Sequence, residues 1–213
     1  MTTISNVSTV SVEIPYEHGG PKASFGGQSW KKLSILLVKV ETQDGFTGWG
    51  EGFSYNCRPA VKAAVERMIA PVVIGRDAGD IIGISRDMQQ KLHLFGRYGI
   101  TIFALSALDI ALWDLAGKRA GLPLHQLMGG AARTHVPGYA SLLKYGEPDL
   151  VGQNVAKARS DGYDAIKIHE TTVAAVAASR EAAGDGTPLM VDTNCPWTPE
   201  QARIMAERLQ VYD

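Results

Sequence analysis

The sequence is poor in cysteine, balanced in charge and without a long uninterrupted hydrophobic run. Only Cys57 and Cys195 are present among 213 residues, which excludes a disulfide scaffold and fits a reducing compartment. The 21 basic and 22 acidic side chains leave a net charge of −1, so we expect no nucleic-acid partner. The N-terminal residues show no basic start followed by an apolar stretch, and we therefore expect no secretory signal.

The most apolar segment, Ile100–Gly117, is interrupted by Asp109 and Asp114. This pattern predicts a buried helix and no membrane partner. Hydrophobic residues make up 45% of the chain, enough to form a core. Composition therefore predicts a soluble, cytoplasmic protein.

The first half of the chain has a strand pattern followed by helical patterns. Val10, Val12 and Ile14 alternate with polar residues, which predicts a strand. Leu33–Val40 and Phe46–Glu51, joined by a turn, complete a three-stranded antiparallel sheet. Helical spacing then predicts three helices, over Val61–Ile69, Asp80–His93 and Thr101–Lys118. The first half is thus predicted to be α+β.

After Gly130 short apolar strands alternate with helices, which predicts parallel strands joined by right-handed crossovers. The predicted strands are Val136–Leu142, Ala165–His169 and Leu189–Thr193. The predicted helices are Asp149–Ser160, Thr172–Ala183 and Thr198–Leu209. We place the domain boundary near Gly130.

Ionisable residues gather at the C-terminal ends of two of these strands. Lys167 and His169 share one face of their strand, and Asp192 and Asn194 share one face of the next. Parallel α/β folds place their active sites at this end of the sheet. We therefore expect the four side chains to converge on one pocket mouth.

These residue types suit abstraction of a proton next to a carboxylate, assisted by a divalent metal. Asp192 is a suitable oxygen ligand for Mg²⁺, although it cannot hold the ion alone. Structural readings stay open: Lys167 can be a solvated side chain, His169 a hydrogen-bonded rim residue and Asp192 part of a turn. The glycine-rich run Gly48–Gly52 does not lie between a strand and a helix, so it is not expected to bind phosphate.

Four motifs carry a family resemblance. The sequence of the predicted helix Ser106–Lys118 resembles the signature of the mandelate racemase/muconate lactonising enzyme family of the enolase superfamily. The region Gly121–Gly130 continues this resemblance with its Gly-Leu-Pro-Leu and Leu-Met-Gly-Gly sequences. Gly45–Glu51 resembles the family's capping-domain hairpin, and Val191–Asn194 its third barrel strand.

The resemblance implies an α+β capping domain over residues 1–130 and the start of a modified TIM (β/α) barrel over residues 131–213. It implies that Asp192 is the first of three acidic ligands for Mg²⁺. Lys167 matches the first lysine of the family's Lys-x-Lys motif, which orients the substrate carboxylate, and His169 replaces the second lysine. We expect Lys167 and His169 to be catalytic and Asn194 to bind substrate.

Further expectations come from the same resemblance. The loops Tyr16–Lys31 and Phe53–Arg58 fall where family members select substrate, and a homo-oligomer is expected. From Val136 onward only about a third of the ~250 residues of a complete TIM barrel is present, so the barrel is incomplete. The other metal carboxylates are expected beyond Asp213.

Three functions are open at this stage. The leading hypothesis is a magnesium-dependent dehydratase of a hydroxy-carboxylate, such as an acid sugar, acting through an enediolate. A racemase or epimerase would use the same intermediate. The third is a catalytically silent carboxylate-binding or structural member, suggested by His169 in place of lysine.

Overall fold

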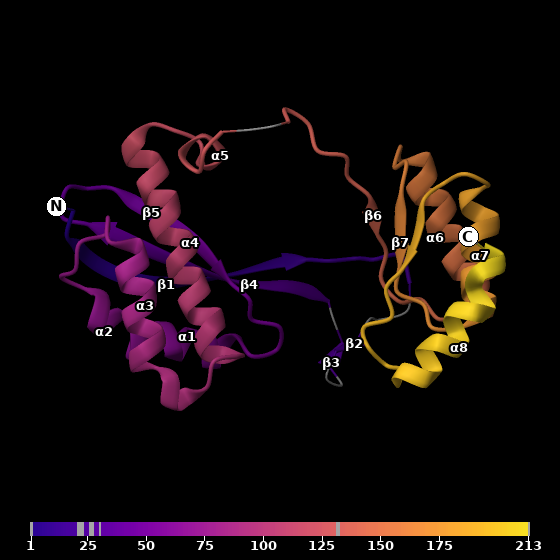
Figure 1. Ribbon diagram of the computed structural model, residues 1–213, viewed down its shortest axis with the longest axis horizontal. Helices are drawn as coiled ribbons and strands as arrows, with labels where there is room; N and C mark the ends of the chain where they lie inside the picture. The colour runs from indigo at the N-terminus through magenta and orange to yellow at the C-terminus, as the bar shows by residue number, and fades with distance from the viewer. Residues whose placement is uncertain (1, 21–23, 26–27, 30, 131–132, 213) are drawn as a thin grey trace. The chain divides into compact units, whose positions relative to one another are not determined.

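The chain forms two compact units in the computed structural model, which describes residues 2–20, 24–25, 28–29, 31–130 and 133–212 (Figure 1). The first unit comprises Met1–Pro15 and Lys32–Thr134, and the second comprises Tyr16–Lys31 and His135–Asp213. The segment between Pro15 and Lys32 thus groups with the C-terminal part of the chain and not with the residues that flank it. The domain limits at residues 1–130 and 131–213 stay a prediction.

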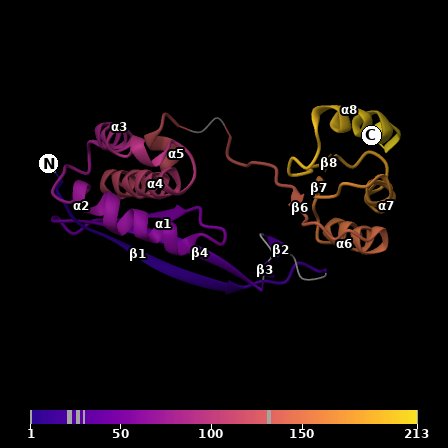
Figure 2. The ribbon, with the colours of Figure 1, turned by 90° about the horizontal axis from the view of Figure 1, so that it is seen from below.

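The first unit contains the predicted three-stranded antiparallel sheet, in the order β1-β4-β5. Its strands are β1 (Ile4–Pro15), β4 (Lys32–Thr42) and β5 (Thr47–Gly52). Its helical segments are α1 (Arg58–Ala64), a π-helix (Val65–Ile69), α2 (Ala70–Val73), α3 (Ile81–Lys91), a 3₁₀ turn (His93–Phe95), α4 (Ile100–Ala120) and α5 (Leu124–Leu127). Figure 2 shows the helices on one side of the sheet. Leu36, Val38 and Val40 of β4 are fully buried in the core that this arrangement forms.

The apolar residues that signalled β1 lie on the other face of the sheet. Val10 pairs with Leu37, whereas Ser11 pairs with the buried Leu36, so the two residues of β1 lie on opposite faces. Val10 and Ile14 are 40% and 44% exposed. The pattern predicted the strand, but the face that carries Val10 and Ile14 is not the one that enters the core, which Val7 joins from the opposite face.

The helix expected over Val61–Ile69 is irregular. An α-helical start gives way to π-helix at Val65–Ile69, and Pro71 follows inside α2. Proline lacks an N–H and its ring crowds the carbonyl four residues earlier, here that of Arg67. The wider π turn is the local response to this clash.

Helix α4 packs directly on β5. An ideal Cβ built on Gly48 would lie 2.0 Å from the Ala111 carbonyl oxygen, and one built on Gly50 would lie 2.1 Å from that of Ala107. The alternate glycines therefore provide the room for a helix on the sheet. By length and composition α4 could cross a membrane, but half of its apolar window is buried within the protein. The predicted buried helix is thus the better description.

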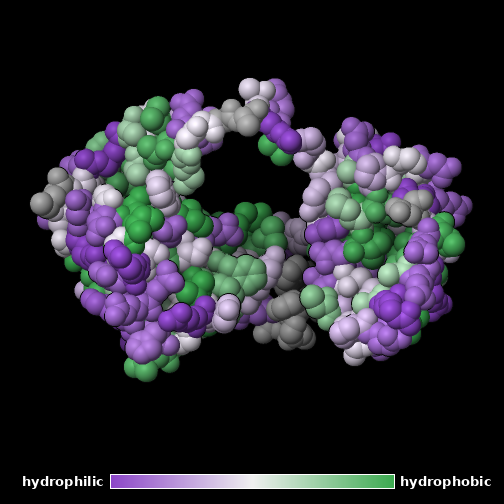
Figure 3. Space-filling model, viewed as in Figure 1, coloured by the Kyte–Doolittle hydropathy of each residue, from purple (hydrophilic) through white to green (hydrophobic). Residues whose placement is uncertain are grey.

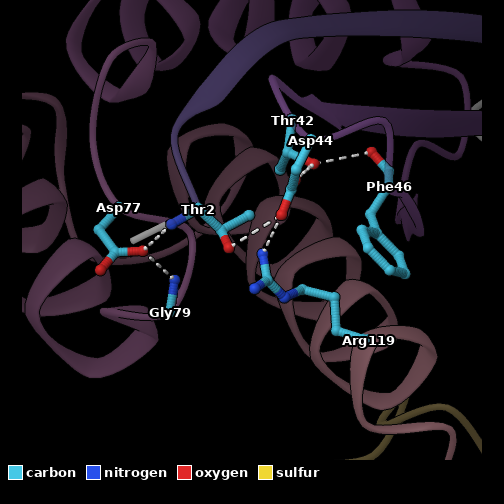
Figure 4. Close-up of polar contacts among 7 residues, drawn as sticks. All are labelled: Thr2, Thr42, Asp44, Phe46, Asp77, Gly79 and Arg119. Atoms are coloured by element: carbon cyan, nitrogen blue, oxygen red, sulfur yellow. Dashed lines mark hydrogen bonds and ion pairs between the residues drawn. The ribbon is translucent and has the colours of Figure 1, made fainter.

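A polar network ties the N-terminal end of the first unit together (Figure 4). Asp77 accepts hydrogen bonds from the backbone N–H groups of Thr2 and Gly79, at 3.0 and 3.1 Å. Asp44 accepts from the Thr42 hydroxyl at 2.6 Å and pairs with Arg119 at 2.6 Å. These bonds hold the pKa of both carboxyl groups below the ordinary value: the Thr42 hydroxyl contributes most at Asp44 and the Thr2 N–H at Asp77.

The loop between α3 and α4 carries hydrophobic side chains at the surface. Leu94 and Phe95 are 81% and 62% exposed. In Figure 3, green hydrophobic atoms are visible at the lower end of the first unit, where this loop lies.

The second unit contains a parallel sheet in the order β6-β7-β8, with its helices following the strands. The strands are β6 (Ala140–Ser141), β7 (Ile166–Ile168) and β8 (Leu189–Val191). The helices are α6 (Pro148–Ser160), α7 (Val173–Ala183) and α8 (Pro199–Leu209), with a final 3₁₀ turn (Gln210–Tyr212). Ile166 and Ile168 are buried in the core between sheet and helices. The start of a β/α barrel is therefore present, as predicted.

The first predicted strand of this unit is much shorter than expected. Val136–Leu142 was predicted, but only Ala140–Ser141 pairs with β7. Pro137 has no N–H to donate to a ladder and Gly138 has no side chain to pack. Val136 is accordingly 82% exposed.

The segment that joins β1 to β4 docks on α6 and on the loop after β6. Tyr145 Oη donates to the carbonyl oxygen of His18 at 2.8 Å, and Asn154 Nδ2 donates to that of Gly19 at 3.0 Å. The short hairpin of β2 (Ser24–Phe25) and β3 (Gln28–Ser29) follows. Residues 21–23, 26–27 and 30 of this predicted substrate-selecting loop lie outside the described residues.

Candidate functional site

Parallel pairing brings three of the predicted site residues together at one end of the second sheet. Lys167 lies within β7 opposite Met190, and the register continues so that His169 and Asp192 follow the paired strand ends. Asp192 N donates to the carbonyl oxygen of Ile168 at 2.9 Å, which extends the ladder by one step. The carboxylate therefore emerges beside the side chains of β7.

The amine of Lys167 and the imidazole of His169 approach the same carboxylate oxygen. Lys167 Nζ lies 3.3 Å from Asp192 Oδ2, and His169 Nε2 lies 3.4 Å from it. The side chains of Lys167, His169 and Asp192 are 20%, 12% and 40% exposed. The group is thus largely enclosed on the β7 side and open at Asp192.

The other nitrogen of His169 indicates which tautomer a neutral ring adopts. His169 Nδ1 lies 2.5 Å from the carbonyl oxygen of Leu142. A carbonyl oxygen only accepts, so the proton of this hydrogen bond belongs to Nδ1. In the neutral ring Nε2 then carries the lone pair, and it is Nε2 that lies beside Asp192. His169 is therefore oriented to take or return a proton at Nε2.

Asp192 is held ionised by its own turn. Asn194 N donates to Asp192 Oδ1 at 3.0 Å, and this bond, followed by the one from Lys167, lowers the pKa of the Asp192 carboxyl group. Asn194 and Cys195 have φ angles of 53° and 57°, in the left-handed region. The turn thus aims a backbone N–H at the carboxylate, while the Asn194 side chain is exposed. Its predicted contact with substrate stays a prediction.

Sequence reasoning missed two neighbours of this group. The ring centroid of Tyr139 lies 5.8 Å from Lys167 Nζ, within range of a cation–π contact. Glu170, next to His169 in sequence, is only 1% exposed. The alternation of β7 places Glu170 on the side of the buried Ile168, which is the one signal that could have drawn attention to it.

Asp192 fits one position of a divalent metal site. Its carboxylate is ionised, partly exposed and hard, which suits Mg²⁺. Among the residues that the structure describes, no group of three His, Cys, Asp or Glu side chains could hold a metal ion. The role of Asp192 as a metal ligand stays a prediction.

Comparison with known families identifies both halves of the chain. The model of the mandelate racemase/muconate lactonizing enzyme N-terminal domain matches residues 2–129, and that of the enolase C-terminal domain-like family matches residues 151–213.

Curated relatives and a solved structure agree with this assignment. An arabinonate dehydratase of Saccharolobus solfataricus is 32% identical, over 84% of this chain and 50% of its own. A 3,6-anhydro-alpha-L-galactonate cycloisomerase of Streptomyces coelicolor is 38% identical, over 85% and 52%. A crystal structure of a mutant L-talarate/galactarate dehydratase with Mg and L-glucarate gives a TM-score of 0.83 at 30% identity, covering 99% of this chain and 56% of that one.

This chain spans about half the length of the curated relatives that it matches. An α+β capping domain followed by the start of a TIM barrel, incomplete in this sequence, is confirmed. The chain belongs to the mandelate racemase/muconate lactonizing enzyme family of the enolase superfamily.

Proposed function

We propose that the protein containing this chain is an acid-sugar dehydratase that removes the proton α to a carboxylate. The observation that carries the proposal is the approach of Lys167 Nζ and His169 Nε2 to one oxygen of Asp192 at the ends of adjacent strands. The dehydratases among the relatives support the substrate class.

Each side chain has a distinct part in this proposal. The Lys167 ammonium group orients the substrate carboxylate by charge. His169 Nε2, unprotonated in the neutral ring, is the group on this face that exchanges a proton with the substrate. Asp192, with carboxylates from elsewhere in the protein, would hold a divalent cation. When bound, that cation supplies positive charge against the charge that develops on the substrate carboxylate.

The reaction balances without a redox partner. The α C–H bond breaks, its electron pair enters the carboxylate as an enediolate, and the proton goes to a base. The β C–O bond then breaks, the hydroxyl leaves as water with a proton from an acid, and the resulting enol becomes a 2-keto acid. His169 serves as the base or as the acid in these reaction steps, according to the configuration of the substrate.

Cycloisomerisation is the second candidate. The relative with 38% identity is a cycloisomerase of an anhydro acid sugar, and another relative is a D-galactarolactone cycloisomerase. In this proposal, cycloisomerisation and racemisation both begin with the same α-proton abstraction as dehydration. The three reactions differ in what then happens to the intermediate. The same Lys167, His169 and Asp192 would serve each of them.

The test uses the full-length protein with Mg²⁺ and a panel of acid sugars and their lactones. Keto-acid formation reports dehydration, and proton NMR in D₂O reports isomerisation and α-proton exchange. We expect His169→Ala to lower kcat by about 10²–10⁴-fold, the usual contribution of general acid–base catalysis. We expect Lys167→Ala to lower turnover with the fold retained.

Matched surface variants control for nonspecific effects. Lys157→Ala removes an exposed lysine of α6, and His93→Ala removes an exposed histidine of the first unit; both should leave turnover unchanged. No turnover and no α-proton exchange by the wild type across the panel, with Mg²⁺ bound, would favour the catalytically silent alternative.

A further inference from the structure

Glu170 is the only charged residue that is buried among the described residues, at 1% exposure. A carboxylate in such a place is costly unless hydrogen bonds replace its water. It directly follows His169 in the sequence and has no part in the proposed chemistry. Hydrogen-bond donors of the protein must therefore replace water around its carboxylate.

The partner is the backbone of the loop that follows β6. Tyr145 N donates to Glu170 Oε1 at 2.6 Å, and Gly146 N donates to Oε1 and Oε2 at 3.1 and 3.3 Å. Hydrogen bonds to an ionised acceptor are roughly twice as strong as neutral ones. Glu170 thus ties the loop after β6 to the residues that follow β7.

That same loop carries the acceptor that orients His169. Leu142 N donates to the carbonyl oxygen of Lys167 at 2.8 Å, which anchors the start of the loop to β7. Leu142 O accepts the His169 Nδ1 proton. Beyond Leu142 the ladder between β6 and β7 has ended, and Glu170 anchors the loop to the β7 side again through Tyr145 and Gly146.

Tyr145 extends the connection to the N-terminal segment. Its hydroxyl donates to the His18 carbonyl oxygen, and burial raises the pKa of Tyr145 to about 12, so the hydroxyl stays protonated. A Cβ on Gly20 would lie 2.5 Å from Tyr145 Cδ1, so this segment lies tightly against the ring. The position of Tyr145 therefore affects both His169 and the segment His18–Gly20.

We propose that Glu170 is a positioning residue for His169. By holding Tyr145 and Gly146 it keeps the Leu142 carbonyl in place, which keeps His169 as the Nδ1–H tautomer with the Nε2 lone pair beside Asp192. Its value for catalysis rests on the proposed function, whereas its effect on the tautomer does not.

The decisive measurement is the tautomer of His169 in the full-length protein. Nitrogen-15 labelling of histidine and long-range proton–nitrogen NMR separate the two tautomers, and the spectrum of His169→Gln assigns the signal. We expect the wild type to show Nδ1–H. Glu170→Leu, which removes the acceptor, should raise the Nε2–H population above that of the wild type. Glu170→Gln, which keeps one acceptor oxygen, should retain more of the Nδ1–H form.

Glu147→Gln is the matched control, since Glu147 lies next to the same loop but is exposed. It should leave the tautomer unchanged. A folded Glu170→Leu protein with the wild-type tautomer overturns the proposal. If that variant does not fold, Glu170→Gln decides: faster amide exchange at Tyr145 and Gly146 with a measurable Nε2–H population supports the proposal, and wild-type values for both overturn it.

Turnover gives a separate readout. Where the wild type is active, Glu170→Gln should lower kcat by a larger factor than it changes KM, because Lys167 is untouched. An inactive wild type would count against the proposed function alone, because the tautomer is measured without substrate.

Discussion

Adding one methyl group to Gly50 should separate α4 from β5 in the first unit. A Cβ at this position would lie 2.1 Å from the carbonyl oxygen of Ala107 and 2.8 Å from the backbone nitrogen of Ala111. Both atoms belong to the helix backbone and cannot rotate away. The strand and helix must therefore move apart by about 1 Å, enough to forfeit a quarter to a half of the dispersion energy of the atoms that line the gap.

The size of the effect is set by two opposing contributions. Overpacking of this kind costs about 1–3 kcal/mol, and a clash with two backbone atoms belongs at the upper end. Alanine restricts the unfolded chain and returns about 0.4–1 kcal/mol. We therefore expect Gly50→Ala to lower the free energy of unfolding by about 2 kcal/mol, which shifts the urea midpoint by about 1 M.

Gly52→Ala is the matched control on the same strand. Its Cβ would lie 3.4 Å from Ala107 Cβ and 3.5 Å from Val61 Cγ1, which is ordinary contact. We expect a change of no more than about 1 kcal/mol, because the new methyl group of this buried residue meets only ordinary contacts and alanine restricts the unfolded chain.

The assay is urea unfolding followed by far-ultraviolet circular dichroism, with amide exchange of residues 47–52 and 100–120 to identify the first unit. Faster exchange in both segments should accompany the lower midpoint of Gly50→Ala. Equal midpoints for Gly50→Ala and Gly52→Ala would refute the close-packing argument.

Two further predictions concern one unit each. Because the pKa values of Asp44 and Asp77 are lowered by folding, their contribution to the stability of the first unit is complete above the unfolded value of about 3.9 and is lost as the pH falls through the lowered values. The urea midpoint of an Asp44→Asn/Asp77→Asn variant should therefore vary less with pH below about 5 than that of the wild type, and parallel curves would contradict this. In the second unit, Thr198→Ala removes the hydroxyl that accepts a hydrogen bond from Gln201 N, and it should lower the stability of α8 by about 1 kcal/mol. The measurement is amide exchange, which should become faster at the start of α8. Thr198→Ser, which keeps the hydroxyl, is the control.

Local sequence patterns were sufficient for most elements of both units. The capping box of Thr198 and Gln201 and the left-handed Gly121 that ends α4 act within a few residues, so they can be recognised in the sequence. The alternation of strands and helices predicted parallel pairing. Since parallel strands share their C-terminal edge, it also predicted that Lys167, His169, Asp192 and Asn194 would converge. The structure brings the first three together, whereas the side chain of Asn194 is exposed.

Long-range contacts could not be predicted in the same way. The apolar residues of β1 marked a strand, but the pairing of Ser11 with Leu36 decided which face entered the core. From the sequence, the glycine-rich run Gly48–Gly52 was only excluded as a phosphate-binding loop. The structure shows that Gly48 and Gly50 are required by the backbone of α4, about 60 residues later in the sequence.

The sequence by itself determined the family, the order of the main strands and helices, and the positions of the three side chains that meet at the end of β7 and β8. Only the tertiary structure decided which nitrogen of His169 carries the proton and what surrounds Glu170. These depend on the Leu142 carbonyl and on the Tyr145 and Gly146 N–H groups, which belong to the backbone and have no signature in side-chain pattern. The register between β6 and β7, about 25 residues apart in the sequence, places the Leu142 carbonyl, and the loop that follows brings the two N–H groups to Glu170. No local rule specifies either contact.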